Sequence, residues 1–185
     1  MKNSAFKEDF DLLHDINPGK HFYQFYKDPN DLLKALAPYW EAGVQKGNYC
    51  FWIAPVYMTV REAKAALTEI PHIEEAFQKG SFEIVSHEDW YGDGETFDGD
   101  LVLNKFTIKL KEVVSRGFSI MRCAGDAFGF KQHLWSALQE YERKGQSQIH
   151  EFPCIALCSY PIHMLRLQQT RDVLDNHHGV LVAHV

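Results

Sequence analysis

Residues 21–53 constrain the fold of this chain most, because they predict a strand, a helix and a second strand in close succession. Residues 21–26 are rich in aromatic side chains, which is typical of a strand. Asp28 suits a helix N-cap and Pro29 suits the first helical turn, and apolar residues then recur at helical spacing. Gly47 can adopt the left-handed backbone conformation that ends many helices. A unit of this length predicts a parallel sheet with right-handed crossovers.

The corner between the first strand and the helix, residues 26–31, contains no glycine. A phosphate-binding loop at this position needs glycines, so that backbone N–H groups can approach phosphate oxygens, and it usually carries a lysine for the outer phosphates. This corner instead carries Asp28 and Asp31 together with a proline, and the two acids would repel an anion. The sequence therefore predicts no ATPase activity and no tight nucleotide binding.

Strands and helices alternate along the rest of the chain. Further strands are predicted at 48–54, 81–86, 118–123, 153–159 and 179–185, and further helices at 60–70, 73–80, 101–114, 132–144 and 162–174. Gly145 is expected to stop the helix before it. This pattern predicts a three-layer αβα sandwich around a mostly parallel central sheet. With 185 residues, the chain is expected to form one domain over 20–185, preceded by an N-terminal arm over 1–19.

Composition narrows the class of function. The formal net charge is −6 and lysines and arginines do not cluster, which argues against direct nucleic-acid binding. The sequence contains no apolar run near the roughly 20 residues of a membrane span, and residues 1–8 lack the apolar core of a signal peptide. We therefore expect a cytoplasmic protein that does not enter membranes. All four cysteines lie in apolar runs, as reduced buried thiols do.

Aromatic side chains gather where the predicted strands end. Ligands of open parallel sheets bind outside the carboxyl ends of the strands, and an aromatic rim with a few polar groups is typical of a small-molecule site. The loop over 87–100 is expected to act as a glycine-containing lid that carries two of these aromatics. The expected ligand-binding residues are His21, Tyr26, Trp52, Trp90, Tyr91, Arg122, Asp126, Cys158, Tyr160 and His178.

For two of these residues, a structural role is an alternative to ligand binding. Arg122 could orient a polar group of a ligand, or it could form a buried ion pair with an acid such as Asp126, Glu140 or Glu142. His21 could be a hydrogen-bonded core histidine. These alternatives stay open at the level of sequence.

The cysteines and histidines show no spacing typical of a metal site. Cys154 and Cys158 share one face of a strand but do not form a Cys-x-x-Cys motif, so structural thiols are favoured over zinc. His177 and His178 fit an exposed pair in a loop equally well. No hydrolase motif and no paired carboxylates are present. We expect neither a metal nor another cofactor.

Taken together, an ordered set of short motifs resembles the MEDS domain, a sensory domain named for methanogen and methylotroph proteins and for the dichloromethane-responsive repressor DcmR. The resemblance covers about residues 20–185. The motifs that carry it are His21 with Phe25-Tyr26, Gly43 and Gly47, the segment 49–53, Trp90-Tyr91, Arg122 with Gly125-Asp126, Tyr141-Glu142, the segment 157–160, and His177 or His178.

The resemblance implies a fold related to the RecA and KaiC ATPase core that has lost its phosphate loop. It also implies a sensor that binds a small organic molecule, such as a simple hydrocarbon derivative, and signals to a DNA-binding or kinase output. One motif departs from the family, because Asp126 and Phe128 stand where an acid followed by a tryptophan is expected. Because the sequence ends at Val185 with no output domain, we expect a stand-alone sensor with a regulatory partner, or a piece of a longer protein.

Two other classes of function remain open. One is a cysteine-dependent enzyme, with Cys158 or Cys123 activated by a nearby histidine. The other is a domain that only binds a protein partner. A homodimer is expected, because two-fold assemblies are the commonest and sensors often couple ligand binding to an oligomer interface.

Overall fold

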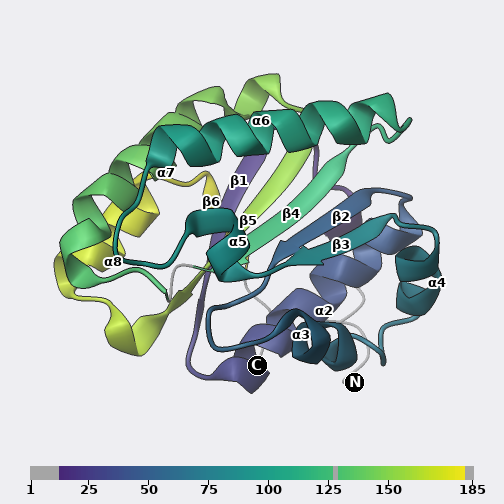
Figure 1. Cartoon of the computed structure of the whole chain (residues 1–185), viewed down its shortest axis with the longest axis horizontal. Helices are drawn as coiled ribbons and strands as arrows, with labels where there is room; N and C mark the ends of the chain where they lie inside the picture. The colour runs from purple at the N-terminus through teal and green to yellow at the C-terminus, as the bar shows by residue number, and fades with distance from the viewer. Residues whose placement is uncertain (1–12, 127–128, 182–185) are drawn as a thin grey trace.

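The computed structural model describes residues 13–126 and 129–181, and within them one parallel sheet forms the centre of the molecule (Figure 1). The strand order is β3-β2-β4-β5-β1-β6, and every described pairing is parallel. The strands are β1 (Lys20–Tyr26), β2 (Tyr49–Ile53), β3 (Phe82–Val85), β4 (Met121–Asp126), β5 (Cys154–Pro161) and β6 (Gly179–Val180).

Helices cover both faces of this sheet, which confirms the three-layer α/β architecture (Figure 1). One face carries α2 (Pro29–Gln45), α3 (Val60–Ala66) and α4 (Ile73–Gln78). The other face carries α6 (Gly99–Ser115) and α7 (Trp135–Gln148), with α8 (Leu167–Asp175) beside α7. Short helical turns complete the chain: α5 (His87–Tyr91), η1 (Gln132–Leu134), η2 (Ile149–Glu151) and η3 (Ile162–Met164).

The first strand–helix–strand unit forms as its sequence predicts. The Asp28 side chain caps α2 by accepting a hydrogen bond from the Asp31 N–H, and Gly47 ends the turn after α2 with a φ of +67°. Asp31 Oδ2 also accepts a hydrogen bond from the backbone N–H of Lys27, at 3.0 Å. Two carboxylates thus occupy the N–H groups of the corner where a phosphate loop would bind its anion.

Several predicted boundaries are wrong. The helix that starts with the Thr59–Glu62 capping box ends at Ala66 instead of residue 70, and the predicted helix 162–174 divides into η3 and α8. Gly145 does not stop α7, which continues to Gln148. A glycine inside a helix costs about 1 kcal/mol of helix propensity but is tolerated where tertiary packing stabilises the helix.

The core is divided by the sheet into two clusters. Beneath α2, α3 and α4, the cluster includes Trp40 and Trp52, whose rings lie 6.3 Å apart. On the α6 and α7 side, Phe51 packs edge-on against Trp90 with ring centroids 4.8 Å apart. Burying an aromatic side chain of this size stabilises the fold by about 1.5–3 kcal/mol. No helix in the described ranges combines the length and the apolar character that crossing a bilayer requires.

Parts of three predicted elements lie outside the described residues. They are residues 1–12 of the N-terminal arm, Phe128 in the motif after β4, and residues 182–185 of the last strand. Leu13, the first described residue of the arm, is buried against the α2 side of the core.

Candidate functional site

A cavity of about 60 Å³ lies between the sheet and the helices α6 and α7. Its walls are mostly apolar, with Leu103 and Phe106 from α6 and Ala156 from β5. By the same measure of volume, one water molecule needs about 10–15 Å³. The cavity therefore has room for a molecule of a few non-hydrogen atoms.

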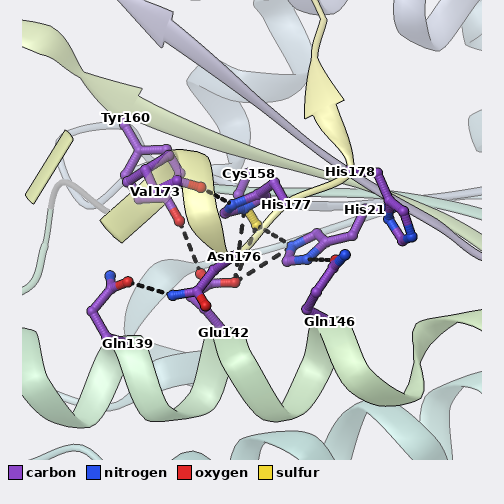
Figure 2. Close-up of polar contacts among 10 residues, drawn as sticks. All are labelled: His21, Gln139, Glu142, Gln146, Cys158, Tyr160, Val173, Asn176, His177 and His178. Carbon is purple, nitrogen blue, oxygen red and sulfur yellow. Dashed lines mark hydrogen bonds and ion pairs between the residues drawn. The ribbon is translucent and has the colours of Figure 1, made fainter. Parts of the chain in front are cut away.

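Polar side chains close one end of this cavity. His21 comes from β1, Glu142 from α7 and Cys158 from β5, and all three line the cavity. Nε2 of His21 lies 3.2 Å from Sγ of Cys158 and 3.4 Å from Oε2 of Glu142 (Figure 2). His177, in the segment that follows α8, adds its Nε2 atom 4.0 Å from the same Glu142 oxygen. We call these four residues the polar cluster.

Surrounding hydrogen bonds hold the polar cluster in place (Figure 2). Tyr160 donates its hydroxyl to Oε1 of Glu142 at 3.1 Å, which leaves Oε2 facing the two histidines. Asn176 donates to Gln139 of α7 at 2.7 Å and so fixes the segment that carries His177. The rings of His21 and His177 lie close together, with centroids 4.1 Å apart.

Burial dominates the acid–base properties of these groups. Burial raises the pKa of Glu142 to about 7, although hydrogen bonds from Tyr160 and Cys158 act in the opposite direction and lower this pKa. It lowers the pKa of His21 well below its usual value, with His177 acting in the same direction, and it lowers the pKa of His177 to about 4. Burial, and then the neighbouring Glu142, raise the pKa of the Cys158 thiol. Both histidines are therefore neutral at neutral pH.

The structure brings several of the predicted site residues together at this cavity. His21, Trp90, Tyr91 and Cys158 line it, and Tyr160 contacts it through Glu142. The cavity reaches from the carboxyl ends of two strands to the middle of the sheet. Ile53, the last residue of β2, and Gly125, the fifth of the six residues of β4, line it near the carboxyl ends of their strands. His21 is the second residue of β1 and pairs with Ala156, the third residue of β5, so its end of the cavity lies under the middle of the sheet.

Two predicted residues do lie at the carboxyl edge. Asp126 is the last residue of β4, and Tyr26 is the last residue of β1. A smaller hollow of about 10 Å³, lined by Asp126, Tyr91 and Glu142 among others, adjoins the cavity. Burial, and then the charge of Asp126, raise the pKa of Tyr26 far above its usual value. Neither residue lines the cavity: Asp126 lines the adjoining hollow, and Tyr26 belongs to the core cluster on the α2 side of the sheet.

Arg122 does not join the site. It is the second residue of β4 and is 1% exposed, and its guanidinium lies over the Tyr39 ring at 4.9 Å. The guanidinium donates to Asn48 Oδ1 at 3.3 Å, to the Tyr39 carbonyl at 3.3 Å and to the Leu13 carbonyl at 3.0 Å. Arg122 does not line the cavity, and among the described residues it forms no ion pair with Asp126, Glu140 or Glu142. Arg122 instead ties β4, α2 and the arm together.

Trp52 and His178 also lie away from the cavity. Trp52 belongs to the core on the α2 side of the sheet, because neighbouring residues of a strand point to opposite faces. His178 is exposed, and its Nδ1 accepts a hydrogen bond from the backbone N–H of His21 at 3.1 Å. Its neighbour His177 is the histidine that reaches the polar cluster.

The predicted lid over 87–100 is wrong in its first part. Residues 87–91 form α5, which Ser86 caps by accepting a hydrogen bond from the Asp89 N–H. Trp90 is 7% exposed, packs against Phe51 and forms part of the cavity wall. These five residues form little more than one helical turn, which is too short for helical spacing of apolar residues to be recognised in the sequence.

Sequence reasoning missed Glu142, His177 and Gln146 as site residues. Glu142 lies one helical turn after Leu138 on the buried face of α7, and an acid on a buried helix face was the available signal. Gln146 follows one turn later, and its side-chain oxygen contacts Nδ1 of His21 at 3.2 Å. The histidine pair offered no sequence signal for choosing between His177 and His178.

Comparisons with known proteins agree with this architecture. The family described as "MEDS: MEthanogen/methylotroph, DcmR Sensory domain" matches residues 20–178. No curated protein matches the sequence significantly.

Solved structures share the fold at low sequence identity. The flagellar accessory protein FlaH from Methanocaldococcus jannaschii is 9% identical with a TM-score of 0.60, over 97% of this chain and 76% of that chain. The KaiC-like protein PH0186 from Pyrococcus horikoshii OT3 is 11% identical with a TM-score of 0.61, over 88% of this chain and 70% of that chain. The similarity confirms the predicted RecA- and KaiC-like fold.

Proposed function

Because this chain belongs to the MEDS family of sensory domains, we propose that it senses a small, largely apolar organic molecule. The observation that carries this proposal is the cavity of about 60 Å³, with apolar walls and the polar cluster at one end. Small-molecule sites combine apolar walls with a few polar groups in the same way. The walls would supply contact area, and the polar cluster would orient a halogen, hydroxyl or similar group.

The volume of the cavity restricts the ligand. A dry cavity of 150 Å³ is large enough to bind benzene, so a cavity of about 60 Å³ fits a molecule with one or two carbon atoms. Dichloromethane and methanol are therefore suitable probes, and toluene is the probe that is too large. We expect saturable binding of one of the small probes, measured by calorimetry or by ligand-observed NMR, and no binding of toluene.

A cavity-filling variant tests where the probe binds. Ala156 lines the cavity, and Ala156→Leu should abolish binding because the larger side chain occupies the space of the ligand. Ala65→Leu places the same substitution on the exposed face of α3, on the opposite side of the sheet, and should bind as the natural protein does. Unchanged binding by a folded Ala156→Leu variant would exclude this cavity as the site.

Cysteine-dependent catalysis is the second candidate function, favoured by the 3.2 Å contact between Cys158 and His21. A thiolate nucleophile needs a basic or cationic neighbour. Burial and the adjacent Glu142 instead raise the pKa of this thiol, which opposes the thiolate. Slow alkylation of Cys158 by a maleimide at neutral pH is therefore the expected result, and rapid alkylation would favour the enzyme.

The signal would pass to a regulatory partner or an attached output domain, with transcription as one regulated process. The proposed setting is the cytoplasm, where thiols stay reduced. We further propose that the sensor acts as a homodimer. Sedimentation over a range of concentrations tests the dimer, and a monomer throughout would exclude it. A domain that binds only a protein partner would show no saturable binding of the small probes.

A further inference from the structure

The geometry points to a binding site for a divalent transition metal of the zinc type, formed by His21, Glu142, Cys158 and His177. Each residue offers one ligand atom, and these atoms all lie within 4.8 Å of one another. Two imidazole nitrogens, one sulfur and one carboxylate oxygen are ligands that zinc accepts, whereas magnesium and calcium prefer oxygen alone. The four residues come from separate parts of the chain, which is why their spacing shows no metal motif.

The distances between the ligand atoms suit tetrahedral coordination. With metal–ligand bonds of about 2.0–2.3 Å, neighbouring ligands of a tetrahedral ion lie about 3.3–3.8 Å apart. Nε2 of His21 lies 3.2 Å from Sγ of Cys158 and 3.4 Å from Oε2 of Glu142. The same Glu142 oxygen lies 3.9 Å from Sγ of Cys158 and 4.0 Å from Nε2 of His177. The two remaining distances, from Nε2 of His177 to Nε2 of His21 and to Sγ of Cys158, are within 4.8 Å, so binding of the ion would draw the His177 ring inward by up to about 1 Å.

Both histidines present a lone pair to the centre of the cluster (Figure 2). Nδ1 of His177 lies 2.7 Å from the Val173 carbonyl, so this nitrogen carries the proton and Nε2 is an acceptor. Nδ1 of His21 is held in the same way by the side-chain oxygen of Gln146. A histidine that ligates a metal donates its other N–H to a carbonyl or carboxylate in this manner.

One of these lone pairs has no hydrogen-bond partner in the part of the chain that the structure describes. Nε2 of His177 makes no hydrogen bond to the described residues, although its side chain is fully buried. A buried polar atom without a partner costs about 1–3 kcal/mol, so native structures rarely leave one. A cation at the centre of the cluster would bind this lone pair together with the other three ligand atoms.

The site would lie at the end of the proposed ligand cavity, because His21, Glu142 and Cys158 line that cavity. A metal there would anchor the polar group of an organic ligand as a fifth ligand, because zinc can expand from four to five ligands. This role of the metal rests on the proposed sensing function. The metal site itself rests on the polar cluster alone.

Metal analysis of the purified protein tests the inference. We expect chelator-stripped protein to take up one equivalent of Zn²⁺ or Co²⁺ per chain and to melt at a higher temperature as the free Zn²⁺ concentration rises. The Co²⁺ form should show the absorption bands of a tetrahedral ion and a thiolate charge-transfer band. Failure of the folded natural protein to bind either ion stoichiometrically would overturn the inference without any variant.

Matched variants assign the ligands. Cys158→Ser should remove the charge-transfer band, and His177→Ala should weaken Co²⁺ binding at least tenfold. Cys154→Ser on the same strand, and His150→Ala at an exposed histidine, should leave both properties unchanged. A charge-transfer band that survives Cys158→Ser in a folded variant would exclude this site. Dichloromethane binding to the stripped protein is measured separately, so loss of the sensing function and loss of the metal site are distinguishable.

Discussion

Gly145→Ala separates ligand binding from stability in a single substitution. Gly145 lies inside α7 and lines the cavity. A Cβ atom there would meet Cδ2 of Leu103 at 3.9 Å, and apart from the local backbone of α7 no other atom of the described residues lies within 4 Å. The added methyl group therefore fits without strain and takes up part of the cavity.

The expected gain in stability has two sources. Alanine is better than glycine inside a helix by about 1 kcal/mol, and burying a methyl group adds up to about 0.8 kcal/mol. The free energy of unfolding should therefore rise by about 1–2 kcal/mol. For a chain of this length, each 1 kcal/mol raises the melting temperature by about 2–4 °C.

The assay combines urea denaturation with a dichloromethane titration of the same variant. We expect higher stability together with weaker binding, an unusual combination that a general loss of structure cannot produce. Higher stability with unchanged affinity would mean that the ligand does not use this part of the cavity. Lower stability would refute the packing argument itself.

Gly43→Ala is the matched control in the other helical layer. A Cβ atom on Gly43 would lie 2.8 Å from both Cδ of Arg122 and Sγ of Cys50, all in the packed interior of the α2 side. The neighbours must move, so the same substitution should destabilise this site by about 1–3 kcal/mol despite the better helix propensity. Its probe affinity should stay unchanged, because Gly43 lies across the sheet from the cavity.

Three further predictions test the surrounding structure. Arg122→Ala should lower the free energy of unfolding by about 3–5 kcal/mol, because three buried acceptors lose their charged donor. Probe affinity in the folded fraction should stay unchanged, and a stable variant that no longer binds the probe would contradict the structural role of Arg122. Burial lowers the pKa of His87 to about 4, so the unfolded chain binds a proton that the folded chain does not between pH 6.5 and 4. Stability should therefore fall as the pH drops through this window, and unfolding curves of His87→Leu should show a smaller fall; an equal fall would assign it to other groups. Magnesium and ATP should not change the melting temperature, since the Asp28 and Asp31 carboxylates already accept hydrogen bonds from the backbone N–H groups between β1 and α2. A micromolar dissociation constant for ATP would contradict this prediction.

Local features of this fold could be read from the sequence because they depend on neighbouring residues. The Asp28 cap and the turn at Gly47 form as predicted, and the Thr59–Glu62 capping box is equally local, since each needs only a few consecutive residues. Alternating strands and helices then predicted the parallel α/β class. Gly145 was misread because its effect depends on the packing of α7, which no local pattern contains.

The sequence by itself thus determined most of the elements, the layered class and the family of this protein, and it named His21, Tyr91 and Cys158, which the structure places around one cavity. Only the tertiary structure decided that Arg122 is a structural tie, and that Glu142 and His177 meet His21 and Cys158 beneath α7. His21 and Cys158 lie 137 residues apart, and their contact depends on β1 pairing with β5. Such a contact comes from strand order and from which face each side chain takes, and these are properties of the assembled sheet and not of any one segment.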